Sequence, residues 1–168
     1  VMNIKKIRVD KEGAGMGWGA VYAQYLESMD QISGQGNGLS VSRQLYKGDE
    51  ALNESAPLKV GDKITVRLTI KADRDMDFVQ IKDDRAACME PLQAVSGFRW
   101  SNGLGYYQAT KDASTQFFID QMRKGTYVIE YQVYVNRTGE YQAGIATVQS
   151  AYAPEFGGHT GGYRVMVE

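Results

Sequence analysis

The chain has 168 residues, which is enough for one domain with a substantial buried core, or for one domain and a fragment of another. Its 19 basic and 20 acidic residues give a formal net charge of -1, so composition gives no support for a broad electrostatic attraction to nucleic acid or to an anionic membrane. The sequence contains no apolar run of about 18 residues and no basic-then-apolar leader, so it predicts no membrane insertion and no export signal of its own.

The N-terminal part differs in composition from the rest. Two short strands are expected within residues 1–30, at 3–9 and 18–27, joined by a turn. Residues 31–38 are polar and rich in glycine, which is typical of a linker. We therefore predict a boundary here, followed by a domain that spans residues 39–168. Because the sequence opens within an expected strand, we also expect a longer parent protein whose targeting signals lie upstream.

Beyond this boundary, apolar and polar residues alternate, which is the period of a strand with one buried face. The alternation is clearest over residues 63–71 and continues over 125–136. An Arg-Thr-Gly-Glu turn then leads into an apolar stretch at 141–150, so we predict a hairpin between the last two segments. Further strands are expected at 39–46, 77–83, 104–109, 114–120 and 162–168.

About seven or eight short strands with turn signals between them predict an all-β fold. The expected architecture is an antiparallel sandwich of immunoglobulin-like or fibronectin-like type, with the N-terminal strand pair as an addition. Tyr127 begins a strand two residues before the inward-facing Ile129. Sandwich domains often return the hydroxyl of such a tyrosine to the backbone, and we expect this tyrosine corner here; simple packing of the ring is the alternative.

One acidic stretch has the spacing of a calcium loop without its other requirements. The carboxylates are those of Asp73, Asp75, Asp77 and Asp84. Phe78 occupies the position where a calcium loop needs glycine, and the residues after it read as a strand. We therefore predict a solvated turn between two strands, with Arg74 as a counter-ion.

No motif predicts catalysis, a metal ion or a cofactor, and we expect no enzymatic activity. The glycine-rich stretches at 13–19 and 34–38 match no phosphate-binding fingerprint. His159 is the only histidine, so a zinc site would lack its usual ligands, and an exposed loop residue is the expectation. Cys88 has apolar neighbours and no basic residue beside it, which predicts a structural thiol.

Aromatic residues are plentiful, with eleven Tyr, five Phe and two Trp. Trp100, Tyr106 and Tyr107 could form a platform on which sugars stack, and this would make the chain a carbohydrate-binding or adhesin module of the cell surface. The competing interpretation is that these rings fill the sandwich core or form cross-strand pairs.

Four segments together resemble the C-terminal region of bacterial alpha-2-macroglobulin-family proteins. They are residues 18–27, 58–85, 105–156 and 162–167, and they carry the motifs DRDMDFV and YAPEF in the family's order. The resemblance implies that residues 39–168 are the last macroglobulin domain and that residues 1–30 are the end of a preceding CUB-like domain. It implies a large extracytoplasmic protein, periplasmic or on the cell surface, that traps target proteases after they cleave a bait segment.

The same resemblance implies a non-enzymatic role for this domain, beside the thioester domain of its own chain. The family's thioester motif is C-x-E-Q, and Pro91 replaces the glutamine after Cys88, so no thioester can form here. Tyr152, Pro154 and Phe156 of the YAPEF motif are the expected contact residues, and apolar side chains at such a loop would keep water from a thioester. In the alternative interpretation, this loop is a crossover whose aromatic rings fill the domain's own core.

Overall fold

The structure is a computed structural model, and it describes residues 6, 8–19, 32, 34–53 and 56–168. These residues form strands, turns and irregular segments, and none of them belongs to a helix long and apolar enough to cross a bilayer. The predicted all-β fold is confirmed. The strands are β1 (Gln35–Asn37), β2 (Leu39–Lys47), β3 (Glu50–Ala51), β4 (Lys63–Ala72), β5 (Met76–Asp84), β6 (Met89–Pro91), β7 (Gly97–Ser101), β8 (Leu104–Thr110), β9 (Ser114–Met122), β10 (Gly125–Val135), β11 (Gly139–Ala143), β12 (Ala146–Ser150), β13 (Gly157–His159) and β14 (Tyr163–Val167).

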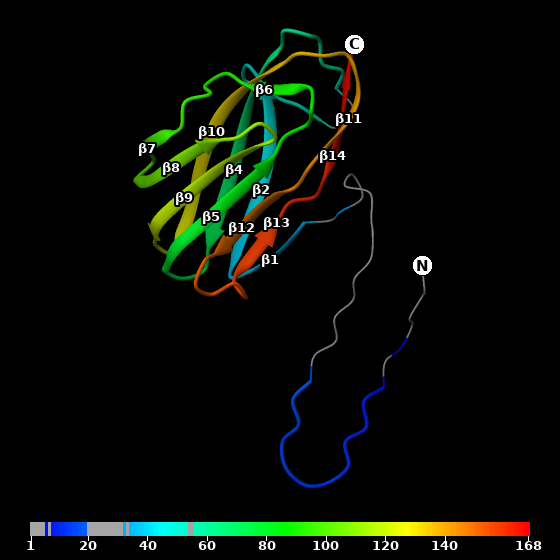
Figure 1. The fold of residues 1–168 in the computed structure, drawn as a ribbon, viewed down its shortest axis with the longest axis vertical. Coiled ribbons are helices and arrows are strands. Elements are labelled where there is room, and N and C mark those ends of the chain that lie inside the picture. The colour runs from blue at the N-terminus through cyan, green and yellow to red at the C-terminus, as the bar shows by residue number, and fades with distance from the viewer. Residues whose placement is uncertain (1–5, 7, 20–31, 33, 54–55) are drawn as a thin grey trace.

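The strands form two packed layers that are joined along one side (Figure 1). One layer has the order β6-β10-β4-β2, with β3 paired to β2, and the other has the order β12-β5-β9-β8-β7. The short strands β1 and β13 pair with each other between β2 and β12, so hydrogen bonding continues from one layer to the next. β11 and β14 form a separate pair. All of these pairings are antiparallel, as predicted for a sandwich.

The core lies between the layers and comes from the alternating strands. In β4 the inward positions are fully buried, while their neighbours in sequence are partly or fully exposed. The largest fully buried side chains include Phe117, Ile64, Leu68, Ile70, Ile81, Ile119 and Ile129. Burial of each such side chain contributes about 1.5–3 kcal/mol to folding, so the period-two pattern is what makes the two sheets pack.

Tyr127 forms the expected tyrosine corner. Its hydroxyl donates a hydrogen bond to the backbone oxygen of Arg123 over 3.0 Å, which reaches back across the turn before β10. The ring itself is only partly buried. The ring also packs against the hydrophobic core, so Tyr127 combines the hydrogen bond of the corner with packing.

The turn between β7 and β8 follows directly from its two residues. Asn102 and Gly103 have φ values of 50° and 80°, which is the left-handed region that a two-residue hairpin turn requires twice. Asparagine and glycine are the residues that adopt it most readily. The turn fixes the register in which Ser101 faces Leu104.

The predicted hairpin between residues 125–136 and 141–150 is wrong. The second segment is two strands, because β11 pairs with β14 while β12 pairs with β5 in the other layer. The chain changes sheets at Gly144, where a Cβ atom would lie 2.4 Å from the Cβ of Asp84. The glycine that the sequence places inside one strand therefore marks a crossing between sheets, where two backbones approach closely.

Part of the expected linker belongs to the fold. Residues 35–37 form β1, where glycines of both paired strands allow a very close approach of backbones. A Cβ on Gly36 would lie 2.7 Å from the carbonyl oxygen of Leu39, and a Cβ on Gly158 of β13 would lie 2.7 Å from the carbonyl oxygens of Gln35 and Leu39. Within the expected N-terminal strand pair and its turn, residues 6 and 8–19 are irregular, and the other residues lie outside the described part of the chain. The division into domains stays a prediction.

Candidate interaction surface

The YAPEF motif forms most of a loop, residues 151–156, between β12 and β13 (Figure 1, lower end of the sandwich). The backbone N–H of Ser150 donates to the carbonyl oxygen of Phe156 over 3.1 Å and closes the base of the loop. From the neighbouring strand β1, the side-chain amide of Asn37 donates to the carbonyl oxygen of Glu155 over 2.7 Å. These bonds give the loop a defined shape and tie it to the sheet.

Tyr152 projects from this loop and rests on one other ring. Its side chain is 79% exposed. The ring meets the ring of Phe78 edge to face, with 5.0 Å between the centroids and 84° between the planes. Phe78 belongs to β5, and its carbonyl oxygen accepts a 2.9 Å hydrogen bond from the N–H of Ala151. One residue of β5 therefore supports both the backbone and the tip of the loop.

The other two expected contact residues of the YAPEF motif, Pro154 and Phe156, differ in how far they are exposed. Pro154 is exposed, as a contact residue must be. Phe156 turns inward: it packs against the hydrophobic core, and the guanidinium of Arg74 lies 4.6 Å from its ring centroid. It also passes so close to Gly38, whose φ is 70°, that a Cβ there would lie 2.7 Å from Phe156 Cδ1. Phe156 is thus half-buried and supports the loop from the core side, and its role as a contact residue stays a prediction.

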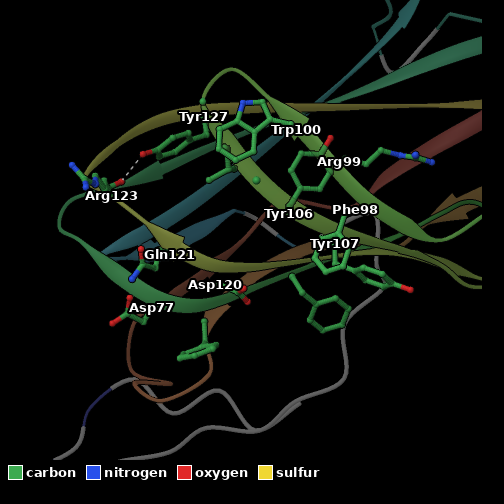
Figure 2. A pocket seen from close by; sticks show the side chains of 15 residues that line it. Asp77, Phe98, Arg99, Trp100, Tyr106, Tyr107, Asp120, Gln121, Arg123 and Tyr127 are labelled. Atoms are coloured by element: carbon green, nitrogen blue, oxygen red, sulfur yellow. Dashed lines mark hydrogen bonds between the residues drawn. The ribbon is translucent and has the colours of Figure 1, made fainter.

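An open groove of about 1170 Å³ lies beside the β7–β8 hairpin and is lined by aromatic and polar side chains (Figure 2). Trp100, Tyr106 and Tyr107 all line it. Tyr106, however, is 6% exposed and contacts the buried ring of Phe117, with 5.7 Å between the centroids. It faces the core, while the strand alternation places its neighbour Tyr107 on the opposite face. The three rings therefore do not form one flat platform.

Trp100 and Phe98 form the aromatic part of the outer face. Trp100 is 76% exposed, and its ring covers the backbone of its cross-strand partner Gly105, where a Cβ would lie 2.7 Å from Trp100 Cζ3. Phe98 is 82% exposed and meets Tyr107 edge to face at 5.1 Å. An aromatic ring over a cross-strand glycine is a known means of stabilising an edge strand, so Trp100 has a structural use besides its exposure.

The residues that the sequence offers as metal-binding or catalytic candidates lie within strands and turns of the fold. His159 is in β13, half-buried, with Nδ1 3.1 Å from the carbonyl oxygen of Thr160. The acidic stretch forms the expected turn between β4 and β5, where Asp73 pairs with Arg74 at 2.8 Å. Across the described residues, no group of three or more histidine, cysteine or acidic side chains is arranged to hold a metal ion. Cys88 is a fully buried free thiol, and burial raises its pKa.

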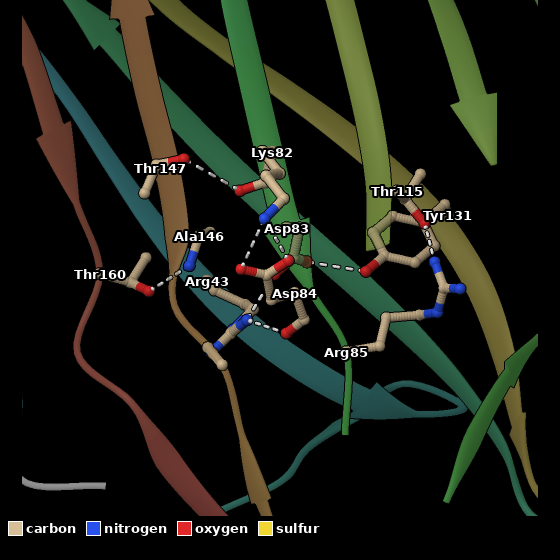
Figure 3. A network of polar contacts seen from close by, with 11 residues as sticks. Arg43, Lys82, Asp83, Asp84, Arg85, Thr115, Tyr131, Ala146, Thr147 and Thr160 are labelled. Carbon is tan, nitrogen blue, oxygen red and sulfur yellow. Dashed lines mark hydrogen bonds and ion pairs between the residues drawn. The ribbon is translucent and has the colours of Figure 1, made fainter. Parts of the chain in front are cut away.

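A buried polar network joins the two layers (Figure 3). Arg43 of β2 and Asp83 of β5 form an ion pair, with side chains 5% and 1% exposed. Tyr131 of β10 donates to Asp83 Oδ2 over 2.7 Å, and Arg43 Nη2 donates to the carbonyl oxygen of Gly144 over 2.6 Å. Burial raises the pKa of Asp83, because desolvation outweighs the attraction of the Arg43 guanidinium, and it also raises the pKa of Tyr131. These groups hold strands together.

Phe78, which supports the 151–156 loop, is not identified as a surface residue by the sequence. The sequence singles it out only as the residue that occupies the glycine position of a calcium loop. What places it beside the 151–156 loop is the pairing of β5 with β12, in which Val79 faces Ser150. That pairing joins segments about seventy residues apart in sequence, and no local pattern signals it.

Comparison with known proteins decides the family. The sequence profile described as the bacterial alpha-2-macroglobulin MG10 domain matches residues 38–155. The chain belongs to this family. The match includes most of the loop that carries Tyr152.

Solved structures share the fold of this MG10 domain. Salmonella alpha-2-macroglobulin reacted with methylamine matches with a TM-score of 0.68 and 19% identity, covering 81% of this chain and 10% of that one. Native alpha-2-macroglobulin from Escherichia coli, spanning domain MG7 to the C-terminus, matches with a TM-score of 0.67 and 16% identity, covering 80% of this chain and 24% of that one.

A curated relative is the circularly permutated Ras protein 2 of Dictyostelium discoideum. It is 26% identical over an alignment 166 residues long, and the alignment covers 95% of this chain and 4% of the relative. The chain therefore spans only a small fraction of this relative and of the two alpha-2-macroglobulins described above.

Proposed function

We propose that this MG10 domain is a non-enzymatic interaction module of a larger bacterial alpha-2-macroglobulin-like protein that traps proteases. In this proposal the 151–156 loop packs against a neighbouring domain of the same chain, and Tyr152 is the central contact. The observation that carries the proposal is an aromatic side chain, 79% exposed, held at the tip of a tied loop. Full burial of a large apolar side chain contributes about 1.5–3 kcal/mol, so covering Tyr152 would favour such a contact.

We propose that the neighbour is the thioester domain, with the CUB-like domain on the N-terminal side. A thioester persists only where water is excluded, and an aromatic ring from an adjacent domain excludes water well. Cys88 does not supply the thioester, because Pro91 takes the place of the required glutamine and the thiol is buried in the core. The target proteases would be met by the parent protein outside the cytoplasm, in the periplasm or on the cell surface.

The test uses the full-length parent with Tyr152→Gly, Tyr152→Phe and Trp100→Ala. Hydrogen exchange reports contact with the neighbouring domain, and the rate of free-thiol release reports shielding of a thioester. We expect Tyr152→Gly to increase exchange in one neighbouring segment and to speed thiol release about tenfold, a change equivalent to about 1.4 kcal/mol. Tyr152→Phe keeps the ring and should resemble the unmodified protein.

Trp100→Ala is the matched control, because it removes a ring of similar exposure from the outer face of the hairpin instead of the loop. It should leave exchange and thiol release unchanged. If Tyr152→Gly resembles the unmodified protein in both measurements, the loop is not a contact and the proposal is wrong.

Oligosaccharide binding is the second candidate function, favoured by the exposed rings of Trp100 and Phe98 beside carboxylates such as Asp120 in the same groove. With Trp18→Phe, Trp100 becomes the only indole of the chain, and its fluorescence reports on the groove. Titration with chitohexaose should then give a saturable change that Phe98→Ala weakens. Constant fluorescence up to about 10 mM sugar, where even weak binding would register, would exclude chitohexaose as the ligand.

A further inference from the structure

We infer that Phe78 is a positioning residue for Tyr152: its left-handed backbone and its ring together fix the direction in which Tyr152 leaves the loop. This inference rests on the proposed function of Tyr152 as a contact between domains. It assigns a role to a residue in another strand, far from the YAPEF motif in sequence.

The backbone of Phe78 is unusual. Its φ is 52°, which is rare for a bulky residue and is a strained conformation that persists only where the surroundings impose it. The consequence is visible in β5, where the buried positions change phase: Met76 is buried, Asp77 and Phe78 are both exposed, and Val79 is buried again. The left-handed residue lies at this change of phase: alternation counted from Met76 would bury its ring, whereas the ring takes the exposed position that precedes Val79.

This rotation brings two groups of Phe78 to the loop at once. The carbonyl oxygen accepts the N–H of Ala151 over 2.9 Å, which extends the β5–β12 pairing past the end of β12. The ring meets the Tyr152 ring edge to face at 5.0 Å. The backbone bond sets where the loop begins, and the ring contact restricts the side chain that follows.

The backbone conformation does not account for a phenylalanine at position 78. Glycine adopts a φ of 52° without strain, so the backbone alone would favour glycine at this position. The chain instead has phenylalanine, 47% exposed, whose recorded ring partner is Tyr152. A side chain as exposed as Tyr152 otherwise exchanges rotamers within nanoseconds. An edge-to-face partner lowers that freedom, and a contact presented in one orientation loses less entropy when its partner domain docks.

Phe78→Gly and Phe78→Asn test the inference, because both residues tolerate the left-handed backbone and remove the ring. In the full-length parent, each should raise hydrogen exchange in the neighbouring segment that Tyr152 protects by about fivefold, the factor that an aromatic pair of this kind confers. Combining Phe78→Gly with Tyr152→Gly should add nothing beyond Tyr152→Gly alone. Tyr134→Ala removes a partly exposed ring from β10, in the other layer, and should leave exchange in that segment unchanged.

Two further readouts on the 168-residue chain separate positioning from stability. The urea midpoint of Phe78→Gly should not fall below that of the unmodified chain, because relief of backbone strain offsets the lost ring contact. The three-bond couplings that report χ1 of Tyr152 should move from one rotamer toward an average. A lower midpoint with unchanged couplings would show that Phe78 only stabilises the fold, and would overturn the inference.

The outcomes also distinguish this inference from the proposed function. If Tyr152→Gly raises exchange in the neighbour but Phe78→Gly does not, Tyr152 is a contact and Phe78 does not position it. If Tyr152→Gly itself has no effect on the parent, the proposed function fails, and the positioning role is then decided by the χ1 couplings alone.

Discussion

The hydroxyl of Tyr131 donates a 2.7 Å hydrogen bond to one carboxylate oxygen of Asp83, and the other carboxylate oxygen is paired with Arg43. The three residues come from β10, β5 and β2, so the network spans both layers of the sandwich. Two charges inside a core are tolerated only while each remains paired, because removal of one leaves the other desolvated without a partner.

Asp83→Ala should therefore lower the free energy of unfolding by about 3–5 kcal/mol, since it leaves the Arg43 guanidinium buried and unpaired. Combining it with Arg43→Met removes both charges and should restore part of that loss. Guanidinium chloride denaturation measures the free energy of unfolding of Asp83→Ala, of Arg43→Met and of the double variant. If the loss in the double variant equals the sum of the losses in the two single variants, the pair is not coupled.

The carboxylate of Asp62 should make stability depend on pH. It accepts hydrogen bonds from Lys47 Nζ over 2.8 Å and from the Lys59 N–H over 2.9 Å, and these lower its pKa below the ordinary value of 3.8. A lowered folded-state pKa gives stability that is complete above the unfolded pKa and is lost as the pH falls through the folded one.

The difference in unfolding free energy between the unmodified chain and Asp62→Asn should accordingly be constant above about pH 5 and shrink below it. Urea denaturation at a series of pH values measures this difference. Asp49→Asn, which removes an exposed carboxylate in a nearby turn, is measured as the control. A difference that grows as the pH falls would contradict the assigned hydrogen bonds.

Gly158→Ala should be strongly destabilising, by about 3 kcal/mol, because its Cβ would meet backbone atoms on the neighbouring strands that cannot move aside. Gly97→Ala is the matched control: it lies at the start of β7 with no atom within 4 Å of the added carbon. Its effect should stay within about 0.5 kcal/mol. Similar thermal stabilities for the two variants would mean that β1 and β13 are not closely packed.

Tyr127→Phe should lower the free energy of unfolding by about 1 kcal/mol, the net contribution of one hydrogen bond, because it removes only the hydroxyl that donates to the Arg123 carbonyl. Tyr134→Phe on the same strand removes a hydroxyl from a side chain that is 39% exposed and serves as the control. Equal unfolding free energies for these two variants would assign Tyr127 to packing alone.

The strands that the sequence predicts well are those with one buried face. Residues 63–71 alternate without interruption, and the structure forms β4 at 63–72. Such a pattern reflects burial directly, so it survives tertiary context. The strands β1 and β13 carry little apolar side chain, and they exist because glycine permits two backbones to meet. Their pairing and the crossing at Gly144 depend on long-range contacts that no local period reveals.

The candidate surface is predictable to a similar degree. Tyr152 and Pro154 stand in a motif that can be recognised, and both are exposed in the structure. Phe156 shares the motif but is turned inward, because Gly38 leaves room for its ring. Phe78 could not be predicted, since phenylalanine has no preference for a positive φ and its partner lies in a distant loop.

The most direct test of the central claim is a photo-crosslink from position 152. Full-length parent protein carrying p-benzoylphenylalanine at Tyr152 is irradiated, and the crosslinked peptides are identified by mass spectrometry. The same probe at Tyr134, which pairs with Glu90 at the β6 end of β10, is the control. We expect an intrachain crosslink from position 152 to one segment outside residues 1–168, and no such crosslink from position 134. Labelling of solvent alone, or equal crosslinking from both positions, would contradict it.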